Sequence, residues 1–291
     1  MTEAPVLTKT PPARRRGALG RLWRRPSAVV GIVLLGAVVL MSLLAPWIAP
    51  MPENAQNWGE RLLPPSAKHP FGTDEFGRSV LSRALYGGRI SLLSGILPVL
   101  MGGVIGTLLG LLAGYFGGWV DRVLTLVFDI LLAFPAIFLA LAIVGAFGPG
   151  FVNALLAVAV VSIPAYARLV RAEVLRLRDT EFVEAARATG ASGGRIVLRH
   201  LLPNAFSPLV VQATLSIGYA ILATAGLSFL GLGVQPPVSD WGEMLSSGRQ
   251  YLPEAWWLEL FPGLFILATV LGANLLGDAL RDALDPRSAR R

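Results

Sequence analysis

Six long runs of apolar residues constrain this chain more than any other feature of its sequence. The first run, residues 28–49, contains 22 residues without a charge, and about 20 helical residues cross the roughly 30 Å core of a bilayer. The others cover residues 90–113, 123–147, 151–167, 209–230 and 260–276. These runs are too long and too apolar on every side for helices of a soluble core. The sequence predicts an all-α, polytopic membrane protein with six transmembrane helices.

The composition supports a membrane protein. Of the 291 residues, 54% are hydrophobic and 15% are charged, and the mean hydropathy is +0.63. Soluble domains are about 25% charged, so a soluble fold of this composition would expose large apolar patches. Intrinsic disorder is excluded because it requires low hydrophobicity. The absence of cysteine excludes disulfides and thiolate metal sites, and two histidines argue against a multi-histidine metal site.

Residues 1–27 form a basic segment with seven Lys and Arg residues, followed directly by the first apolar run. A cleaved signal peptide is the alternative interpretation, because small residues occur near Ala45 and Ala49. Signal peptide cores are only about 7–15 residues long. We therefore expect residues 28–49 to be the first transmembrane helix and residues 1–27 to be a cytoplasmic tail.

The distribution of basic residues predicts the orientation in the membrane. Nineteen of the 25 Lys and Arg residues lie in residues 1–27, 114–122, 168–205 and 281–291, and six lie in residues 50–89, 148–150 and 231–259. The first set alternates with the second along the predicted spans. Both termini are therefore expected in the cytoplasm, and the sequence pI of about 10.5 reflects topology and lipid contact rather than nucleic-acid binding.

The outer loop, residues 50–89, precedes a transmembrane core that we place at residues 90–280. Near its end, Val80, Leu81, Ala84 and Leu85 share one helical face. This pattern predicts a short amphipathic helix at the membrane interface. On the same outer side, interfacial anchoring is expected for Trp241, Trp256 and Trp257.

The inner loop, residues 168–205, has the pattern of two helices joined by a glycine turn. Asp179 or Thr180 can cap a first helix, and Gly190 stands where a helix end requires positive φ. Ser192 can cap a second helix, and Pro203 is expected to interrupt it.

The inner loop is either a charged linker or a docking element for a soluble partner. Phe182 is followed by the small residues Ala185 and Ala186, which would let a partner approach closely. These three residues favour docking.

The inner loop also resembles the EAA loop of permease subunits of bacterial ABC importers. The matching residues are Glu184, Ala185, Ala186, Gly190 and Ile196, followed by His200, Pro203 and Asn204. The loop precedes the penultimate span, as in that family. Further segments are similar to the second-permease type of the peptide/nickel (dipeptide/oligopeptide) branch: residues 72–83, 114–122, 227–233 and 278–287. The resemblance covers approximately residues 28–287.

The resemblance implies a type I ABC importer permease fold and a transport subunit without catalysis of its own. The residues it assigns to coupling with an ATPase are Glu184, Ala185, Ala186, Gly190, Ile196, Pro203 and Asn204. It implies no cofactor in this chain, with ATP and Mg²⁺ held by partner subunits. The implied partners are a homologous second permease, two ATP-binding subunits or domains, and an extracytoplasmic substrate-binding protein. The implied location of this chain is the cytoplasmic (inner) membrane. The expected cargo is a dipeptide, an oligopeptide or a related small solute, with nickel chelates and glutathione as alternatives.

The residues weigh against two other classes of function. No Gly-x-x-x-x-Gly-Lys-Ser/Thr sequence occurs, so any ATP must be bound by another subunit. An ion-coupled secondary transporter would carry ionisable residues at mid-membrane, and Asp129 is the single such residue in the first five runs. Asp129 is expected near the cytoplasmic surface, where it either pairs with Arg122 or caps a neighbouring helix. A membrane enzyme would need a catalytic constellation at membrane depth, and none occurs there.

Overall fold

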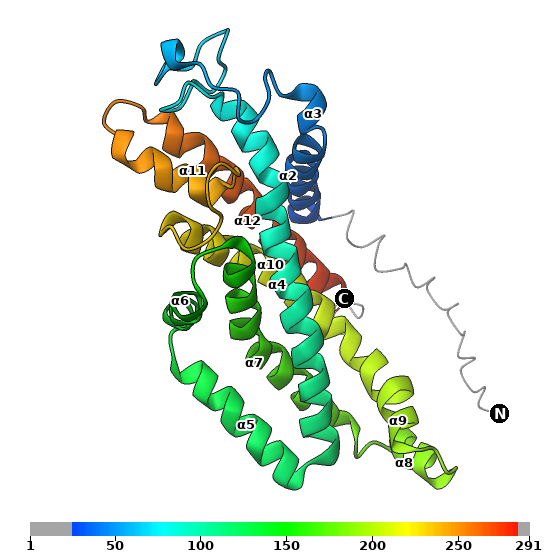
Figure 1. The fold of residues 1–291 in the computed structure, drawn as a ribbon. Coiled ribbons are helices and arrows are strands. Elements are labelled where there is room, and N and C mark those ends of the chain that lie inside the picture. The colour runs from blue at the N-terminus through cyan, green and yellow to red at the C-terminus, as the bar shows by residue number, and fades with distance from the viewer. Residues whose placement is uncertain (1–24, 285–291) are drawn as a thin grey trace, which may run out of the picture.

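The computed structural model describes residues 25–284, which form helices and connecting loops without a β-sheet (Figure 1). Most of the predicted N-terminal tail and the end of the C-terminal tail lie outside the described residues. The helices are α2 (Pro26–Leu43), α3 (Ala45–Ile48), α4 (Val80–Phe116), α5 (Gly118–Ala133), α6 (Ala136–Phe147), α7 (Phe151–Leu177), α8 (Glu181–Ala188), α9 (Gly193–Ile196), α10 (Leu202–Phe229), α11 (Trp241–Gly248) and α12 (Trp257–Leu284). Short 3₁₀ turns occupy Trp58–Glu60 and Arg249–Tyr251, and a π-helical turn occupies Val197–Leu201.

Five helices in the described part are long and apolar enough to cross a membrane: α2, α4, α7, the continuous segment Gly193–Phe229, and α12. The remaining predicted span, residues 123–147, is not one straight helix. It consists of α5 and α6, which meet at an angle of 94°. Pro135 explains the break, because a proline disfavours helical geometry at the preceding residue, and Phe134 is extended at φ −91° and ψ 137°.

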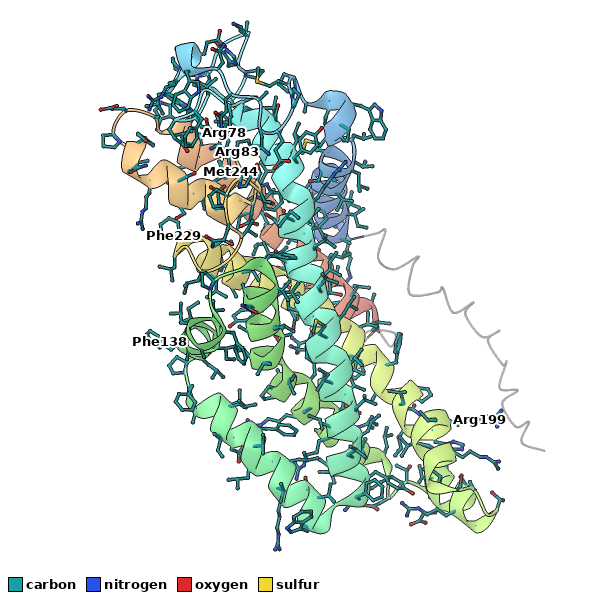
Figure 2. All side chains as sticks on the ribbon, viewed as in Figure 1. Arg78, Arg83, Phe138, Arg199, Phe229 and Met244 are labelled. Carbon is teal, nitrogen blue, oxygen red and sulfur yellow. The ribbon has the colours of Figure 1, made fainter. Side chains whose placement is uncertain are left out.

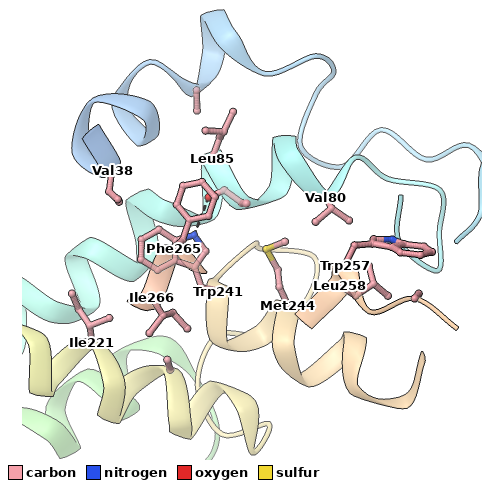
Figure 3. Packing of buried hydrophobic residues seen from close by; sticks show 14 residues of the cluster. Val38, Val80, Leu85, Ile221, Trp241, Met244, Trp257, Leu258, Phe265 and Ile266 are labelled. Carbon is pink, nitrogen blue, oxygen red and sulfur yellow. Dashed lines mark hydrogen bonds between the residues drawn. The ribbon is translucent and has the colours of Figure 1, made fainter. Parts of the chain in front are cut away.

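The predicted interfacial helix near residue 80 is the start of a transmembrane helix instead. Residues 80–116 form one helix of 37 residues, and the Ser79 side chain caps it by accepting a hydrogen bond from the Ser82 N–H. The apolar face is real, but it meets protein: Val80, Ala84 and Leu85 are buried in a cluster with residues of α11 and α12 (Figure 3). This face therefore packs against helices distant in the sequence instead of lying on the membrane surface.

The tryptophans of the outer side also differ from expectation. Trp241 is fully buried in the same cluster and Trp257 is 4% exposed. Their indole N–H groups donate to the carbonyl oxygens of Ala84 and Thr73, at 2.9 and 3.1 Å. Buried indoles need such acceptors, so these two residues join the outer loop to α11 and α12. Of the three tryptophans predicted as anchors, only Trp256, 52% exposed, has the exposure that this role requires.

Close packing of α4 against α7 depends on a stripe of four glycines. Gly102, Gly106, Gly110 and Gly114 recur every fourth residue of α4, so they share one face. A Cβ atom at Gly106 would lie 2.6 Å from the carbonyl oxygen of Ile163, and one at Gly110 would lie 2.4 Å from that of Ala167. Small residues of this kind let membrane helices pack backbone to backbone. No other residue type fits without separating the two helices.

Substitution of Gly110 tests this packing. We expect Gly110→Ala to destabilise the helix pair by about 1–3 kcal/mol, the usual cost of overpacking. Gly103→Ala is the matched control, because its Cβ would lie at an ordinary contact distance of 3.5 Å from Tyr166. The measurement is the thermal unfolding midpoint in detergent. Equal midpoints for the two variants would contradict the proposed packing.

Candidate functional site

The inner loop folds as two short helices with a glycine turn between them, as the sequence predicts. Gly190 has φ +81°, and its N–H donates to the carbonyl oxygen of Arg187 at 2.9 Å. The N–H of Ala191 donates to that of Ala186 at 3.0 Å. These two bonds make a Schellman motif, in which a left-handed residue ends the helix and satisfies its last carbonyls. The turn therefore fixes the angle between α8 and α9.

Two predictions for this loop, the side-chain caps and the helix end at Pro203, are wrong. Thr180 and Ser192 occupy the N-cap positions, but neither side chain caps its helix. The Thr180 hydroxyl donates instead to the carbonyl oxygen of Leu177 at 2.5 Å. Pro203 does not interrupt the second helix. It lies in the first turn of α10, where its missing N–H costs little because the preceding π-helical turn has already changed the hydrogen-bond register.

An apolar cluster holds the loop against the membrane helices. Val183 of α8 and Ile196 of α9 are 0% and 1% exposed, and both pack with Val170 and Val174 of α7. The resemblance grouped Ile196 with the residues that contact an ATPase. Its burial gives it another role, because a side chain inside this cluster fastens the loop and is not available on the surface.

The other predicted coupling residues lie at or near the surface. Glu184, Ala185, Gly190, Pro203 and Asn204 are exposed, and Ala186 is half-buried. Phe182 is 44% exposed, although it is a large apolar residue. Its ring is 6.3 Å from that of His200. An exposed phenylalanine beside two alanines on a firmly packed helix is a surface suited to protein contact.

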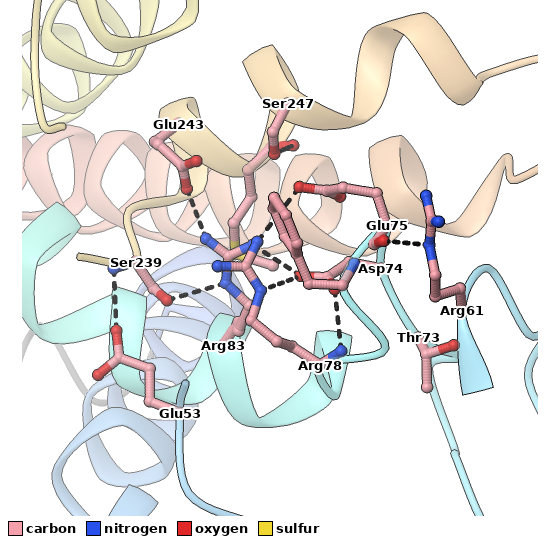
Figure 4. Close-up of polar contacts among 12 residues, drawn as sticks. Glu53, Arg61, Thr73, Asp74, Glu75, Arg78, Arg83, Ser239, Glu243 and Ser247 are labelled. Carbon is pink, nitrogen blue, oxygen red and sulfur yellow. Dashed lines mark hydrogen bonds and ion pairs between the residues drawn. The ribbon is translucent and has the colours of Figure 1, made fainter. Parts of the chain in front are cut away.

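A buried ionic cluster lies at the opposite end of the molecule. The sequence analysis counted its arginines as topology signals and included residues 72–83 in the family resemblance, but it predicted no contact among these charges. Figure 2 shows Arg78 and Arg83 at one end and Arg199 near the inner loop at the other. The Arg83 guanidinium contacts Asp74 at 2.9 Å, Glu243 at 2.8 Å and the Ser239 hydroxyl at 3.1 Å (Figure 4). Arg78 contacts Asp74 at 2.6 Å and Glu75 at 3.2 Å.

This ionic cluster has three carboxylates for two guanidinium groups. Burial raises the pKa of Glu243, against the opposing effect of Arg83. Burial and the charge of Asp74 raise the pKa of Glu75. The cluster joins the outer loop to α11, whose N-terminus Asp240 caps by accepting from the N–H groups of Gly242 and Glu243. The i,i+4 spacing of Asp74 and Arg78 was the one local signal of this cluster in the sequence.

Asp129 pairs with Arg168 of α7 and not with Arg122 as expected. Both side chains are about half exposed, so the pair is a surface contact between α5 and α7. Asp121 of α5 makes a second contact of this kind with Arg171, at 2.7 Å. Among the described residues, no cluster of acidic or histidine side chains could hold a metal ion.

Comparison with known proteins agrees with this fold. Residues 106–290 match the family described as binding-protein-dependent transport system inner membrane component. Residues 14–65 match the N-terminal transmembrane domain of oligopeptide transport permease C. The chain belongs to the first family, and thus to the permeases of ABC importers.

Several curated relatives are similar over nearly their whole length. The dipeptide transport system permease protein DppC of Alkalihalophilus pseudofirmus is 48% identical, covering 94% of this chain and 90% of that protein. The glutathione transport system permease protein GsiD of Escherichia coli O6:K15:H31 is 47% identical, covering 92% and 88%. The inward-facing MetNI methionine ABC transporter is similar in fold, with a TM-score of 0.55 and 23% identity over 69% of this chain and 96% of that one.

Removing the central guanidinium tests the role of the ionic cluster. We expect Arg83→Met to destabilise the outer region by about 3–5 kcal/mol, because it leaves Glu243 buried without its cation and leaves Asp74 with Arg78 alone. Lys68→Met is the control: Lys68 pairs with Glu60 but is 70% exposed, and such surface pairs contribute about 0–1 kcal/mol. Hydrogen exchange of α11 is the readout. Unchanged protection in Arg83→Met would contradict a stabilising role.

Proposed function

We propose that this chain is a permease subunit of an ATP-driven importer that moves peptides across the cytoplasmic membrane. The observation that carries the proposal is the exposed surface of α8 formed by Phe182, Ala185 and Ala186, on a loop packed firmly onto α7. The cargo is inferred from the relatives, since proteins named for dipeptide, D,D-dipeptide and glutathione transport are 45–48% identical to this chain. All three of these cargoes contain peptide bonds.

The complex would contain four further components: a homologous second permease, two ATP-binding subunits or domains, and an extracytoplasmic substrate-binding protein. The lack of a phosphate-binding loop in the sequence supports ATP and Mg²⁺ binding by separate subunits, and this chain would be neither an enzyme nor a holder of cofactors. The family description, which names transport that depends on a binding protein, supports the extracytoplasmic partner.

Glu184, Ala185, Ala186, Gly190, Pro203 and Asn204 would contact the ATPase, with Ile196 holding the loop from inside. Closure of the two ATPases on ATP would displace α8 and α9. Because Val183 and Ile196 tie these helices to α7, the displacement would pass to the membrane helices as a rigid-body movement. The importer would thus alternate between inward- and outward-facing states, each stabilised by a different ligand.

The charge distribution supports an orientation with both termini and the inner loop in the cytoplasm. The outer loop with its ionic cluster would then face the binding protein. This places the two ends of the molecule in contact with different partners, ATPases on one side and the substrate carrier on the other.

Reconstitution tests the proposed function. In proteoliposomes with all partner subunits, we expect uptake of a radiolabelled dipeptide only when ATP is present inside and the loaded binding protein outside. Uptake without ATP would instead indicate an ion-coupled transporter. ATP-dependent uptake of a nickel chelate in place of the dipeptide would overturn the peptide assignment.

Replacement of Gly190 tests coupling. Gly190→Val should lose substrate-stimulated ATP hydrolysis and uptake together, because a β-branched residue with positive φ costs about 1–2 kcal/mol and changes the turn. Gly190→Ala should have a smaller effect. Gly194→Ala is the control, since Gly194 has negative φ and open space for a Cβ. Full stimulation in Gly190→Val, in complexes of verified stoichiometry, would show that the loop is only a linker.

A further inference from the structure

A groove runs between α7 and α10, and two adjoining cavities form it. The first, of about 320 Å³, lies beside Tyr166 of α7 and Ser216 of α10. The second, of about 650 Å³, lies toward the inner loop beside Glu173 and Asn204. Gln212 and Leu215 line both cavities, so the two lie next to each other along α10. Figure 1 shows α7 and α10 side by side along this stretch.

One face of α10 lines the whole groove. Between Asn204 and Tyr219, each lining residue of α10 is either adjacent to the next one or three positions before it. Residues with this spacing share one face of a helix. Fifteen helical steps of 1.5 Å give this face a length of about 22 Å. A face of that length exceeds half of the roughly 30 Å core of a bilayer.

The first cavity is uncharged and mostly apolar, with a few hydrogen-bonding groups on its wall. None of its nine lining residues carries a charge, yet Tyr166, Gln212, Ser216 and Tyr219 all bring hydrogen-bonding groups to it. Ser216 lies near the centre of this 28-residue helix. Polar side chains at such depth are costly in lipid and mark functional positions in membrane proteins.

Two of these polar groups have hydrogen-bonding capacity left over. Tyr166 is 1% exposed. Among the described residues its hydroxyl makes no hydrogen bond of normal geometry, and the Ser216 hydroxyl is its polar neighbour. The Gln212 amide donates to the Ser216 hydroxyl at 3.2 Å, which leaves the amide oxygen as an acceptor. A buried, unpartnered hydroxyl at a cavity needs a water or ligand partner.

We propose that this face of α10 lines the substrate route, and that Tyr166, Gln212 and Ser216 form an uncharged binding station for peptide amide groups. The proposal rests on the proposed function and adds to it the residues that meet the cargo. A glutamine side chain both donates and accepts hydrogen bonds, which matches the N–H and C=O of a peptide bond. Since every peptide has these groups, the station binds the backbone and is indifferent to side chains.

The second cavity differs in charge and completes the route. Glu173 and Arg176 form an ion pair at 2.6 Å at its edge, and Arg281 of α12 lines it as well. Charged groups here lie where water enters from the cytoplasm. A peptide released from the uncharged station would therefore meet a hydrated, ionic exit in which its own charged termini are solvated.

Cysteine accessibility tests the route directly. The chain contains no cysteine, so an introduced thiol is the only one in this subunit. In the reconstituted complex, we expect a membrane-impermeant methanethiosulfonate to label Gln212→Cys and Ser216→Cys, and saturating alanyl-alanine with binding protein to slow that labelling. Ala213→Cys is the matched control, because Ala213 packs against the buried cluster around Val158 and should stay unlabelled.

A transport measurement complements the labelling. Gln212→Leu should lower dipeptide uptake about tenfold, the effect of one lost hydrogen bond in a site poor in water, while loaded binding protein still stimulates ATP hydrolysis. Labelling at residue 213 equal to that at 212, or normal uptake by Gln212→Leu, would overturn the proposal. If the unmodified complex imports no peptide, the proposed function fails, and labelling protected by another solute would still identify the groove as the route.

Discussion

Backbone contact between α4 and α7 is the interaction on which the rest of the structure depends. The glycine stripe on α4 brings the two helices so close that carbonyl groups of α7 occupy the space of missing side chains. This contact fixes α7, and α7 in turn carries the inner loop, supplies one wall of the groove and binds α5 through ion pairs. Hydrophobicity alone could not fix it, because lipid tails are as apolar as the helices they surround.

Different kinds of interaction hold the two ends of the molecule in place. The outer loop is held by guanidinium–carboxylate contacts around Arg83 and by two indole donors, whereas the inner loop is held by an apolar cluster around Ile196. Charge and hydrogen-bond direction fix the outer end, whereas close aliphatic packing fixes the inner end by shape. Both ends are therefore held firmly, and a displacement of the inner loop would pass to α7 instead of being absorbed within the loop.

Local patterns in the sequence predicted most of the helices and the inner loop, because hydrophobic length and glycine position act over a few residues. The positive φ of Gly190 and the break between α8 and α9 are of this kind. Long-range contacts were not predictable in the same way. The face of Val80 and Ala84 was recognised, but nothing nearby in the sequence shows that Trp241 covers it. Arg83 and Glu243 are 160 residues apart, so their pairing appears only in the folded chain. The bend at Pro135 was missed, since residues 123–147 were predicted as one span, although the proline is a local signal for it.

The unbroken helical segment from Gly193 to Phe229 has a mechanical consequence. At 1.5 Å per residue its 37 residues make a rod of about 55 Å, one end of which belongs to the inner loop while its middle lines the groove. A tilt of about 5° at the inner-loop end moves the far end by roughly 5 Å, as simple geometry requires for a rod of this length. In the proposed importer this segment would act as a lever, so that work done on α9 would reach the groove without a relay of side chains.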